Sequence, residues 1–424
     1  MVISIKILTE VLNYLIEIEK DIFSIKNGVD SNKNKIISNI NSVIEIINKL
    51  DKFDNLKQML KCCYTKLTVD MNYSECLIIL KNIFMTLILP DFSILEGFDN
   101  AGSIKIENFL SNVPDYENLK EFSYYILSKL YKKSDPYKSY KYGISVFETN
   151  NKFANNYNIK YIYNPDSVKE YFFDKCPICQ SDRITPFFNI EQFRAPGVTT
   201  LFSPYKLWNK CEDCTNLFAY NFPISNMAII NGHYSAFMGN MYIEPRYPLR
   251  IYSDIFNNCR KYTKGKKYLE IGVGNGEMIS CALEMGYEIT AVEICKEDCE
   301  NISNVLDIDI INDNFINVDF NEKFDIIIMG DVLEHVSEPK EALRKIKYIL
   351  NTNGVLWIST PNYLSAFSRM RKDKDPMWNQ KNHFTYFCYD GLNRILRELG
   401  FKVDRYDISL RYNGSMELYV TMPD

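Results

Sequence analysis

The sequence has no apolar run of the length that a membrane span requires. Its most apolar region, residues 76–89, is interrupted by Lys81 and Asn82, and it is shorter than the ~18 apolar residues that mark a transmembrane helix. Residues 1–23 carry charged side chains throughout, so they lack the unbroken apolar stretch of a secretory signal peptide. We therefore expect a soluble, cytoplasmic protein.

The chain also lacks an excess of positive charge. Its 49 Lys and Arg residues are outnumbered by 54 Asp and Glu residues, which gives a net charge of −5. Tight binding to a phosphate backbone needs many cations, because its affinity comes largely from released counterions. The balance of charge therefore disfavours nucleic acid as a partner and favours a small molecule.

The N-terminal part of the chain lacks any group of residues typical of a catalytic site. A length of 424 residues predicts two or three domains. Within residues 1–165, apolar side chains recur at steps of three and four, which predicts an all-helical domain. The predicted helices cover 2–27, 36–50, 56–67, 76–89 and 119–131, and residues 137–165 are expected to be an irregular linker or an edge element. We interpret the domain as a packing module that could support a homo-oligomer, with partner docking or substrate gating as the alternative.

Cysteine is plentiful, with 12 residues, and four of these form two C-x-x-C pairs. The pairs are Cys176/Cys179 and Cys211/Cys214. In a reducing compartment such pairs indicate metal ligation, and four thiolates predict a structural zinc site with no open position. The interval between the pairs exceeds the common ~15–20 residues, and Gln180 and Thr215 stand where zinc knuckles often have glycine. We predict a zinc ribbon and connector over residues 170–245.

Glycine is scarce, with 17 residues, yet three glycines stand close together at Gly272, Gly274 and Gly276. They follow an apolar run that begins at Tyr268, and a helix-like segment over 277–284 comes next. A strand, a glycine turn and a helix N-terminus allow a nucleotide-like cofactor to approach the backbone closely. The spacing differs from the G-x-G-x-x-G of dinucleotide sites, and the Gly-Lys-Ser/Thr of a phosphate loop is absent.

A carboxylate follows the next predicted strand. Glu293 lies about 20 residues past the first glycine, where an acid accepts the hydroxyls of a ribose. With these features, residues 246–424 resemble the class I S-adenosylmethionine (SAM)-dependent methyltransferases. The segments that carry the resemblance are 269–276, Glu293, 312–315, 324–336 and 354–362.

The resemblance implies an α/β fold, a Rossmann-like seven-stranded methyltransferase sheet. We predict strands over 268–272, 288–293, 308–311, 324–329 and 355–360, followed by a C-terminal antiparallel hairpin of 401–409 and 415–421 around a turn at 411–414. A zinc ribbon directly before such a domain resembles bacterial methyltransferases that act on sugars or other small metabolites.

The resemblance also implies the site residues. The SAM-binding candidates are Glu270, Gly272, Gly274, Gly276, Glu293, Asn312, Asp313, Asn314 and Asp331. The catalytic candidates are His383, His335 and Asp331. For the two histidines the reason is that an imidazole can take up a proton near neutrality. Asp331, Glu334 and His335 are expected at the end of the fourth strand, where ligands bind in such sheets, and Glu334 and His335 are expected to begin a helix. Helix packing or capping is the structural alternative for His335, and a surface or hinge position is expected for His233.

The predicted function is methyl transfer from SAM to a small-molecule acceptor, with Zn²⁺ as a structural ion. A nucleotide-linked sugar or a surface-polysaccharide precursor is the acceptor class that the resemblance implies. The absence of an Asn/Asp-Pro-Pro-Tyr sequence argues against methylation of amino groups on bases. Two alternatives remain: an RNA methyltransferase whose zinc ribbon reads RNA through a basic face around residues 181–210, and a non-catalytic scaffold.

Overall fold

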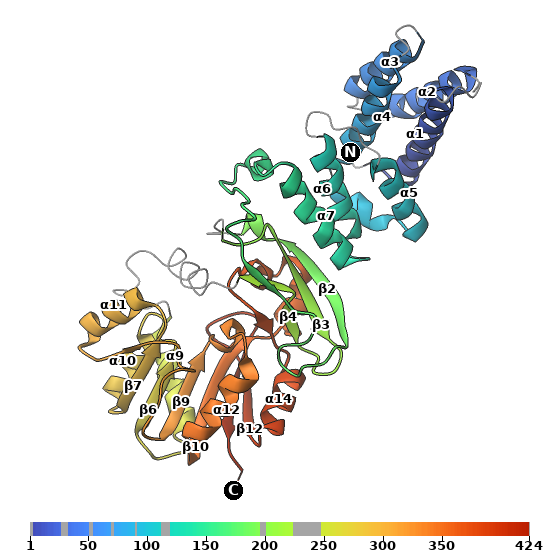
Figure 1. Ribbon diagram of the computed structural model, residues 1–424. Helices are drawn as coiled ribbons and strands as arrows, with labels where there is room; N and C mark the ends of the chain where they lie inside the picture. Colours follow the sequence, from blue (N-terminus) through green and yellow to red (C-terminus); the bar gives the residue numbers. More distant parts are fainter. Residues whose placement is uncertain are drawn as a thin grey trace. The chain divides into compact units, whose positions relative to one another are not determined.

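The computed structural model describes residues 3–26, 33–50, 54–68, 72–89, 91–111, 119–195, 201–223 and 247–423. The expectation for His233 and most of the predicted connector before residue 246 therefore lie outside the described residues. The chain divides into two compact units (Figure 1). One comprises Met1–Asn164 with Ser203–Tyr205, and the other comprises Pro165–Phe202 with Lys206–Asp424.

The first unit is built from helices, as the apolar periodicity predicts. Its α-helices are α1 (Ile5–Lys26), α2 (Lys33–Asn48), α3 (Asp54–Thr68), α4 (Tyr73–Ile88), α5 (Asn100–Ser111), α6 (Leu119–Tyr131) and α7 (Pro136–Thr149). The 3-10 turn η1 (Phe92–Gly97) lies between α4 and α5, and a second, η2 (Phe153–Tyr157), follows α7. The apolar faces of α1 to α6 meet in one core, because burial of these stripes is what stabilises helices of this length.

The prediction of an irregular segment over 137–165 was wrong, since α7 occupies its first half. The helix begins with a signal that the composition of the segment conceals. The Asp135 side chain accepts a hydrogen bond from the Lys138 backbone N–H at 2.9 Å, and Pro136 stands at the start of the helix. Both are typical of a helix N-terminus.

The second unit contains the predicted seven-stranded sheet. Its strands are β6 (Lys267–Ile271), β7 (Glu288–Glu293), β8 (Ile311–Asn312), β9 (Phe324–Gly330), β10 (Leu350–Pro361), β12 (Lys402–Ile408) and β13 (Ser415–Thr421). Their order is β12-β13-β10-β9-β6-β7-β8, with β13 antiparallel to both of its neighbours. The C-terminal hairpin is confirmed, whereas the third strand is shorter than predicted and begins at Ile311.

Helices cover both faces of this sheet (Figure 1). They are α9 (Leu249–Cys259), α10 (Glu277–Glu284), α11 (Lys296–Leu306), α12 (Pro339–Ile349) and α14 (Tyr389–Glu398), with the short α13 (Ala366–Arg371) after β10. Successive residues of β9 point to opposite faces. Ile327 packs in the core that includes α12 and α14, and Ile326 packs in the core that includes α9 and α10.

A smaller sheet carries the cysteine pairs. It contains β2 (Ile184–Glu191), β3 (Tyr205–Cys211), β4 (Leu217–Ala219) and β11 (Thr385–Tyr386) in the order β11-β4-β3-β2, and β1 (Glu170–Phe172) pairs with β5 (Asn221–Pro223) beside it. Strand β11 comes from the loop between β10 and α14. A segment of the methyltransferase-like region therefore completes the sheet of the cysteine-bearing region.

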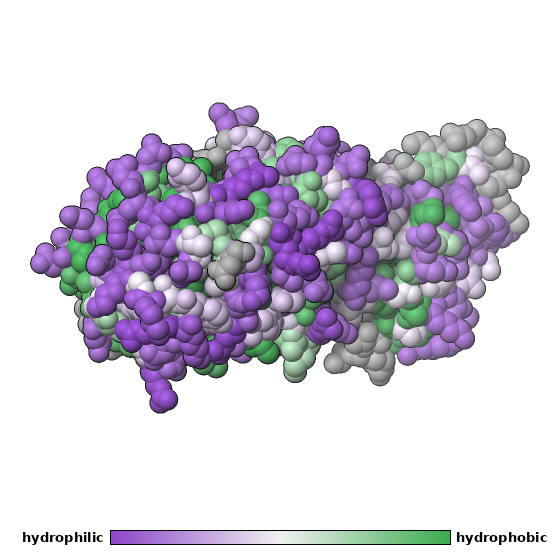
Figure 2. All heavy atoms as spheres, turned by 90° about the horizontal axis from the view of Figure 1, so that it is seen from below, coloured by the Kyte–Doolittle hydropathy of each residue, from purple (hydrophilic) through white to green (hydrophobic). Residues whose placement is uncertain are grey.

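Most hydrophobic side chains of both units are in their interiors. The face drawn in Figure 2 is mainly hydrophilic, with hydrophobic residues in small patches. Within the described ranges, no helix combines the length and the hydropathy that crossing a membrane requires.

Candidate functional site

A cavity of about 390 Å³ lies where the central strands of the large sheet end. Gly272 directly follows β6, Asp331 directly follows β9, and Pro361 ends β10, and all three line the cavity. The carboxyl ends of parallel strands are the usual ligand-binding edge of an open α/β sheet. A volume of this size is that of a small-molecule site.

The glycine turn forms one wall of the cavity. Gly272 has a φ of +78°, and a Cβ atom there would lie 2.5 Å from a methyl group of Val332. Gly274 has a φ of +52° and lines the cavity, and a Cβ atom there would have no protein atom within 4 Å. Gly272 is thus required by the packing of the protein itself, whereas Gly274 leaves its backbone open to a ligand.

The cavity wall is rich in carboxyl groups. Its acidic residues are Glu270, Glu277, Asp298, Asp331, Glu334 and Asp375. Arg411 is the only Lys or Arg among the described lining residues. Because opposite charges attract strongly where water is excluded, such a wall favours a ligand that carries positive charge.

Glu270, the acid before the glycine turn, is buried at the end of β6. Its carboxylate accepts a hydrogen bond from the hydroxyl of Tyr268. Burial raises the pKa of Glu270 to about 8, because the charged form loses its hydration. A positively charged group in the cavity would favour the ionised form.

Asp331 is held by two partners at the end of β9. Its carboxylate lies 3.1 Å from Nη2 of Arg411, and it accepts a hydrogen bond from the hydroxyl of Ser359 at 2.9 Å. The guanidinium of Arg411 also lies over the ring of Trp357, 5.1 Å from its centre. Sequence reasoning missed Arg411 as a site residue, because nothing in the predicted hairpin turn at 411–414 showed that this turn would reach the cavity.

The two catalytic histidine candidates meet in the cavity. The ring centres of His335 and His383 are 4.6 Å apart, at an interplanar angle of 83°. Nδ1 of His335 lies 3.0 Å from the carbonyl oxygen of Asn382, and Nδ1 of His383 lies 3.1 Å from the hydroxyl of Tyr386. The fold therefore brings together two histidines from separate segments of the chain.

Glu334 lies beside these imidazoles and is almost fully buried. It accepts a hydrogen bond from the hydroxyl of Thr360 at 2.9 Å. Burial, and then the nearby charge of Asp331, raises the pKa of Glu334 well above its usual value. The helix expected to begin at Glu334 and His335 is only a 3-10 turn, η4 (Leu333–His335), and α12 begins at Pro339.

The other SAM-binding candidates lie outside the cavity wall. In the described part of the chain, the lining does not include Gly276, Glu293, Asn312, Asp313 or Asn314. Gly276 instead caps α10 with a φ of +77°. The side-chain amide of Asn312 donates hydrogen bonds to backbone carbonyls at the end of β7.

Glu293 is held by backbone groups. Its side chain accepts hydrogen bonds from the N–H groups of Val273, at 3.0 Å, and Cys295, at 2.8 Å, and the residue is only 9% exposed. Each carboxylate oxygen has a second lone pair, so these bonds do not prevent it from accepting a further hydroxyl. Its role at a ribose stays a prediction.

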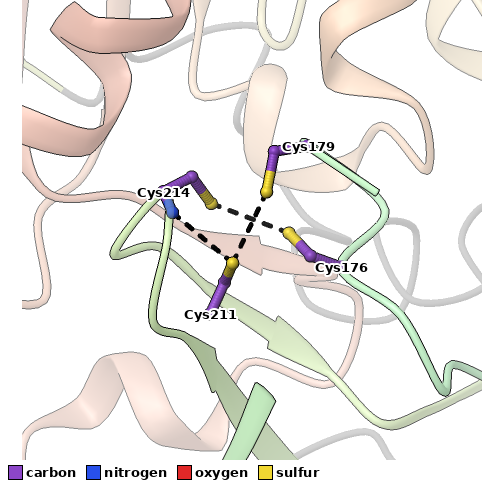
Figure 3. Close-up of side chains that lie close together, drawn as sticks. All are labelled: Cys176, Cys179, Cys211 and Cys214. Atoms are coloured by element: carbon purple, nitrogen blue, oxygen red, sulfur yellow. Dashed lines mark hydrogen bonds between the residues drawn. The ribbon is translucent and has the colours of Figure 1, made fainter. Parts of the chain in front are cut away.

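The four cysteines of the two C-x-x-C pairs converge on one point (Figure 3). The Sγ atoms are 3.6 Å apart between Cys176 and Cys214, and 3.5 Å apart between Cys179 and Cys211. Four thiolates at about 2.3 Å from a tetrahedral Zn²⁺ would be about 3.8 Å from one another. The arrangement is therefore nearly that of a zinc-bound set.

The two turns that carry these cysteines have the same backbone geometry. In each, the residue after the second cysteine donates its N–H to the carbonyl of the first, at 2.8 Å for Gln180 and 3.0 Å for Thr215. Gln180 and Thr215 have φ values of +63° and +61°. Both positions therefore have the left-handed conformation that glycine usually provides in a zinc knuckle. For a residue with a side chain, this conformation costs about 1 kcal/mol.

Comparison with known proteins adds to this geometry. A family model described as a methyltransferase domain matches residues 245–406. The chain is 24% identical over 165 residues to an uncharacterized methyltransferase of Staphylococcus carnosus (strain TM300), a match that covers 36% of this chain and 78% of that protein. It is 30% identical over 109 residues to the ubiquinone biosynthesis O-methyltransferase of Haemophilus ducreyi, covering 23% of this chain and 46% of that protein.

The chain thus spans about half the length of the ubiquinone biosynthesis enzyme that it matches.

Among solved structures, the chain is similar to a SAM-dependent methyltransferase from Clostridium acetobutylicum ATCC 824. The identity is 12%, the TM-score is 0.35, and the match covers 42% of this chain and 93% of that one. It is also similar to magnesium protoporphyrin IX methyltransferase from Synechocystis PCC 6803, with 14% identity, a TM-score of 0.36, and coverage of 47% and 94%.

Proposed function

We propose that this chain, which carries a class I SAM-dependent methyltransferase domain over residues 245–406, transfers a methyl group from SAM to a hydroxyl group of a small-molecule acceptor. One observation carries the proposal. A single cavity joins the open backbone at Gly274, a wall rich in carboxylates, and the imidazoles of His335 and His383.

SAM brings two positive groups, an amino group and a sulfonium, into such a site. In our proposal the amino-acid half of SAM lies over Gly272 and Gly274, with its amino group near Glu270 and Asp331. Glu293 binds the ribose, and the segment 312–314 contacts the adenine. The acidic wall supports this placement, because buried carboxylates stabilise cations much more strongly than water-exposed ones do.

The reaction itself needs little covalent help from the protein. The sulfonium already activates the methyl group, so the main task is to hold the acceptor oxygen in line with the methyl carbon and the sulfur and to exclude water. In our proposal, His383 or His335 accepts the hydroxyl proton as the oxygen attacks. Asp331, fixed by Arg411, helps to position the reacting groups.

Replacing Glu270 with Gln tests the placement of SAM. Because the folded pKa of about 8 lies above the ordinary value of 4.5, the folded chain holds a proton that the unfolded chain releases, and stability falls as the pH rises from about 4.5 to 8. Gln removes this penalty. From this shift we expect E270Q without ligand to be more stable than the wild type by about 4 kcal/mol at pH 8, with little gain at pH 4.5, as measured by urea unfolding.

The same variant should bind SAM and S-adenosylhomocysteine more weakly, because the amino group loses its anionic partner. Calorimetry with wild-type protein should show affinity that increases through pH 8, whereas E270Q should show a flat profile. A wild-type chain that binds neither molecule would contradict the proposed function. Equal affinity in both proteins would contradict only the role of Glu270.

A nucleotide-linked sugar, or another precursor of a surface polysaccharide, is the acceptor class that we propose. The polar lining suits a molecule with several hydroxyl groups, and the acidic wall implies that any diphosphate would stay outside the cavity. RNA is not favoured by the segment 181–210. Arg183, Arg194 and Lys210 each form an ion pair with a nearby carboxylate, and Lys206 is buried.

We also propose that the four-cysteine cluster holds a structural Zn²⁺. The short Sγ–Sγ distances and the two matching left-handed turns support it. Replacing Cys211 with Ser should remove one zinc ion per chain, as measured by plasma emission spectroscopy, and should lower the thermal stability of this region, since binding of a structural zinc contributes directly to folding.

Cys62 provides the matched control for this zinc experiment. It is an exposed cysteine in the helical unit, outside the cluster. C62S should keep the zinc content and the melting temperature of the wild-type protein. A zinc content that is unchanged in C211S would contradict the proposed site.

A further inference from the structure

A second group of possible metal ligands lies within the cavity. Glu334, His335 and His383 each offer one ligand atom, and these atoms lie within 4.8 Å of one another. We propose that these three side chains bind a divalent first-row transition-metal cation, whose remaining coordination positions take an oxygen atom of the acceptor. The part about the acceptor rests on the proposed function, whereas binding of the cation does not.

The ligand types suit such a cation. Two imidazoles and one carboxylate, with a position left open, are a common ligand set of catalytic zinc and of non-haem iron. Ligand atoms about 2.1 Å from one metal ion are about 3 to 4 Å apart. Modest side-chain rotations would therefore bring the three groups to bonding distance. This ligand set differs from that of the four-cysteine cluster, where thiolates would fill every coordination position.

Both imidazoles are oriented as metal ligands usually are. The carbonyl of Asn382 can only accept, so the nearby Nδ1 of His335 carries the proton and the ring has its lone pair on Nε2. The hydroxyl of Tyr386 donates to the carbonyl of Met377, and its oxygen then accepts from Nδ1 of His383. A hydrogen bond from the second ring nitrogen typically fixes the tautomer of a metal-binding histidine.

Glu334 is held in place at both its carboxylate and its backbone. The hydroxyl of Thr360 donates to one oxygen of Glu334, and the backbone carbonyl of Glu334 accepts from the N–H of Phe384 at 2.7 Å. The second bond joins the loop after β9 to the loop that carries His383. A buried carboxylate beside Asp331 is costly unless a cation compensates it, and a metal ion would supply that charge.

A bound metal would change the part that the histidines play. A ring nitrogen that coordinates a cation cannot also accept a proton, so these two imidazoles would no longer serve as the base. The cation would instead lower the pKa of the bound acceptor hydroxyl, which would release its proton to solvent water, and would fix its oxygen in the cavity.

The proposal is tested by titrating Co²⁺ into the full-length, zinc-loaded protein and following heat and visible absorption. We expect the wild-type protein to bind one Co²⁺ ion in addition to its zinc. In the variants E334Q and H335Q/H383Q, the affinity of this site for Co²⁺ should fall at least ~10-fold. Its spectrum should lack the thiolate-to-cobalt charge-transfer band of a cysteine site. Gln keeps the size of Glu334 and can still accept from Thr360.

E338Q is the matched control. It makes the same chemical change four residues later, at an exposed side chain that forms no capping hydrogen bond, and it should bind Co²⁺ like the wild type. If E334Q fails to fold, the single variant H383Q tests the site instead. His383 is only half-buried in a loop, so its replacement should leave the fold intact. Wild-type protein that takes up no Co²⁺ beyond the cysteine site, or E334Q that binds it equally well, would overturn the proposal. Calorimetry with S-adenosylhomocysteine keeps this outcome separate from failure of the proposed function.

Discussion

Substitution of Gly274 by Ala should weaken the binding of S-adenosylhomocysteine by 10- to 100-fold, or about 1.4 to 2.8 kcal/mol. The added methyl group would meet no protein atom within 4 Å. Because Gly274 lines the cavity, the methyl would occupy space that the cofactor needs. Calorimetry on the purified full-length chain measures the effect directly.

Gly286 provides the control, since it has a similar backbone but lies outside the cavity. Its φ is +74°, and a Cβ atom there would meet only the end of the Lys266 side chain, at 3.6 Å. Both G274A and G286A should lose about 1 kcal/mol of folding stability, because each forces a side chain into the left-handed region. Only G274A should lose affinity. Equal affinity in the two variants would mean that the cofactor does not lie over the glycine turn.

The sequence predicted the parts of the site that depend on local pattern. The run of residues 268–276 combines strand, turn and helix start within a few positions, and the positive φ values at its glycines are what that spacing requires. The hairpin after residue 401 could be predicted for the same reason, since alternation along a strand is visible without knowing its neighbours. Gln180 and Thr215 show the limit of this approach, because the turn geometry is kept there without glycine.

The parts that depend on long-range contacts could not be predicted. Residues 375–383 and 411–415 form much of the cavity wall. The family resemblance pointed to His383, but neither segment carries a periodic pattern that shows where its loop will lie. The segment 385–386 becomes a strand only because β4 offers it an edge. His383 likewise reaches Glu334 and His335 only because its loop, which lies far along the chain, bonds to the backbone of Glu334 through Phe384.

Lys206 is the clearest example of such a long-range contact, and its replacement should cause a large loss of stability. It lies on β3 and is fully buried, and its ammonium group donates to the carbonyls of Lys381 at 2.7 Å, His383 at 3.0 Å and Gln380 at 3.3 Å. K206M would leave three carbonyl groups, one of them in a fully buried contact, without this donor, at about 1 kcal/mol each. We expect a loss of about 3 kcal/mol in urea unfolding, and slower turnover, because the loop that carries His383 loses its anchor.

Lys210 on the same strand serves as the control for this experiment. Its ammonium group is partly exposed and forms an ion pair with Glu212 at 3.2 Å. Exposed pairs of this kind contribute little, so K210M should lose less than about 1 kcal/mol. If K206M and K210M lost the same amount, the three carbonyl contacts of Lys206 would not be what holds the loop.

The pH dependence of K206M separates the charge of Lys206 from its packing. Burial lowers the pKa of Lys206 to about 7, against the opposing attraction of Glu170. Between pH 7 and 10.5 the unfolded chain therefore binds more protons at this residue than the folded chain does, and the wild-type protein gains stability as the pH rises, by up to about 1.4 kcal/mol per pH unit. Met cannot titrate, so the stability gap between wild type and K206M should be wider at pH 9 than at pH 7. A gap that is constant with pH would mean that Lys206 stays charged at every pH tested and that its three hydrogen bonds outweigh the cost of its burial.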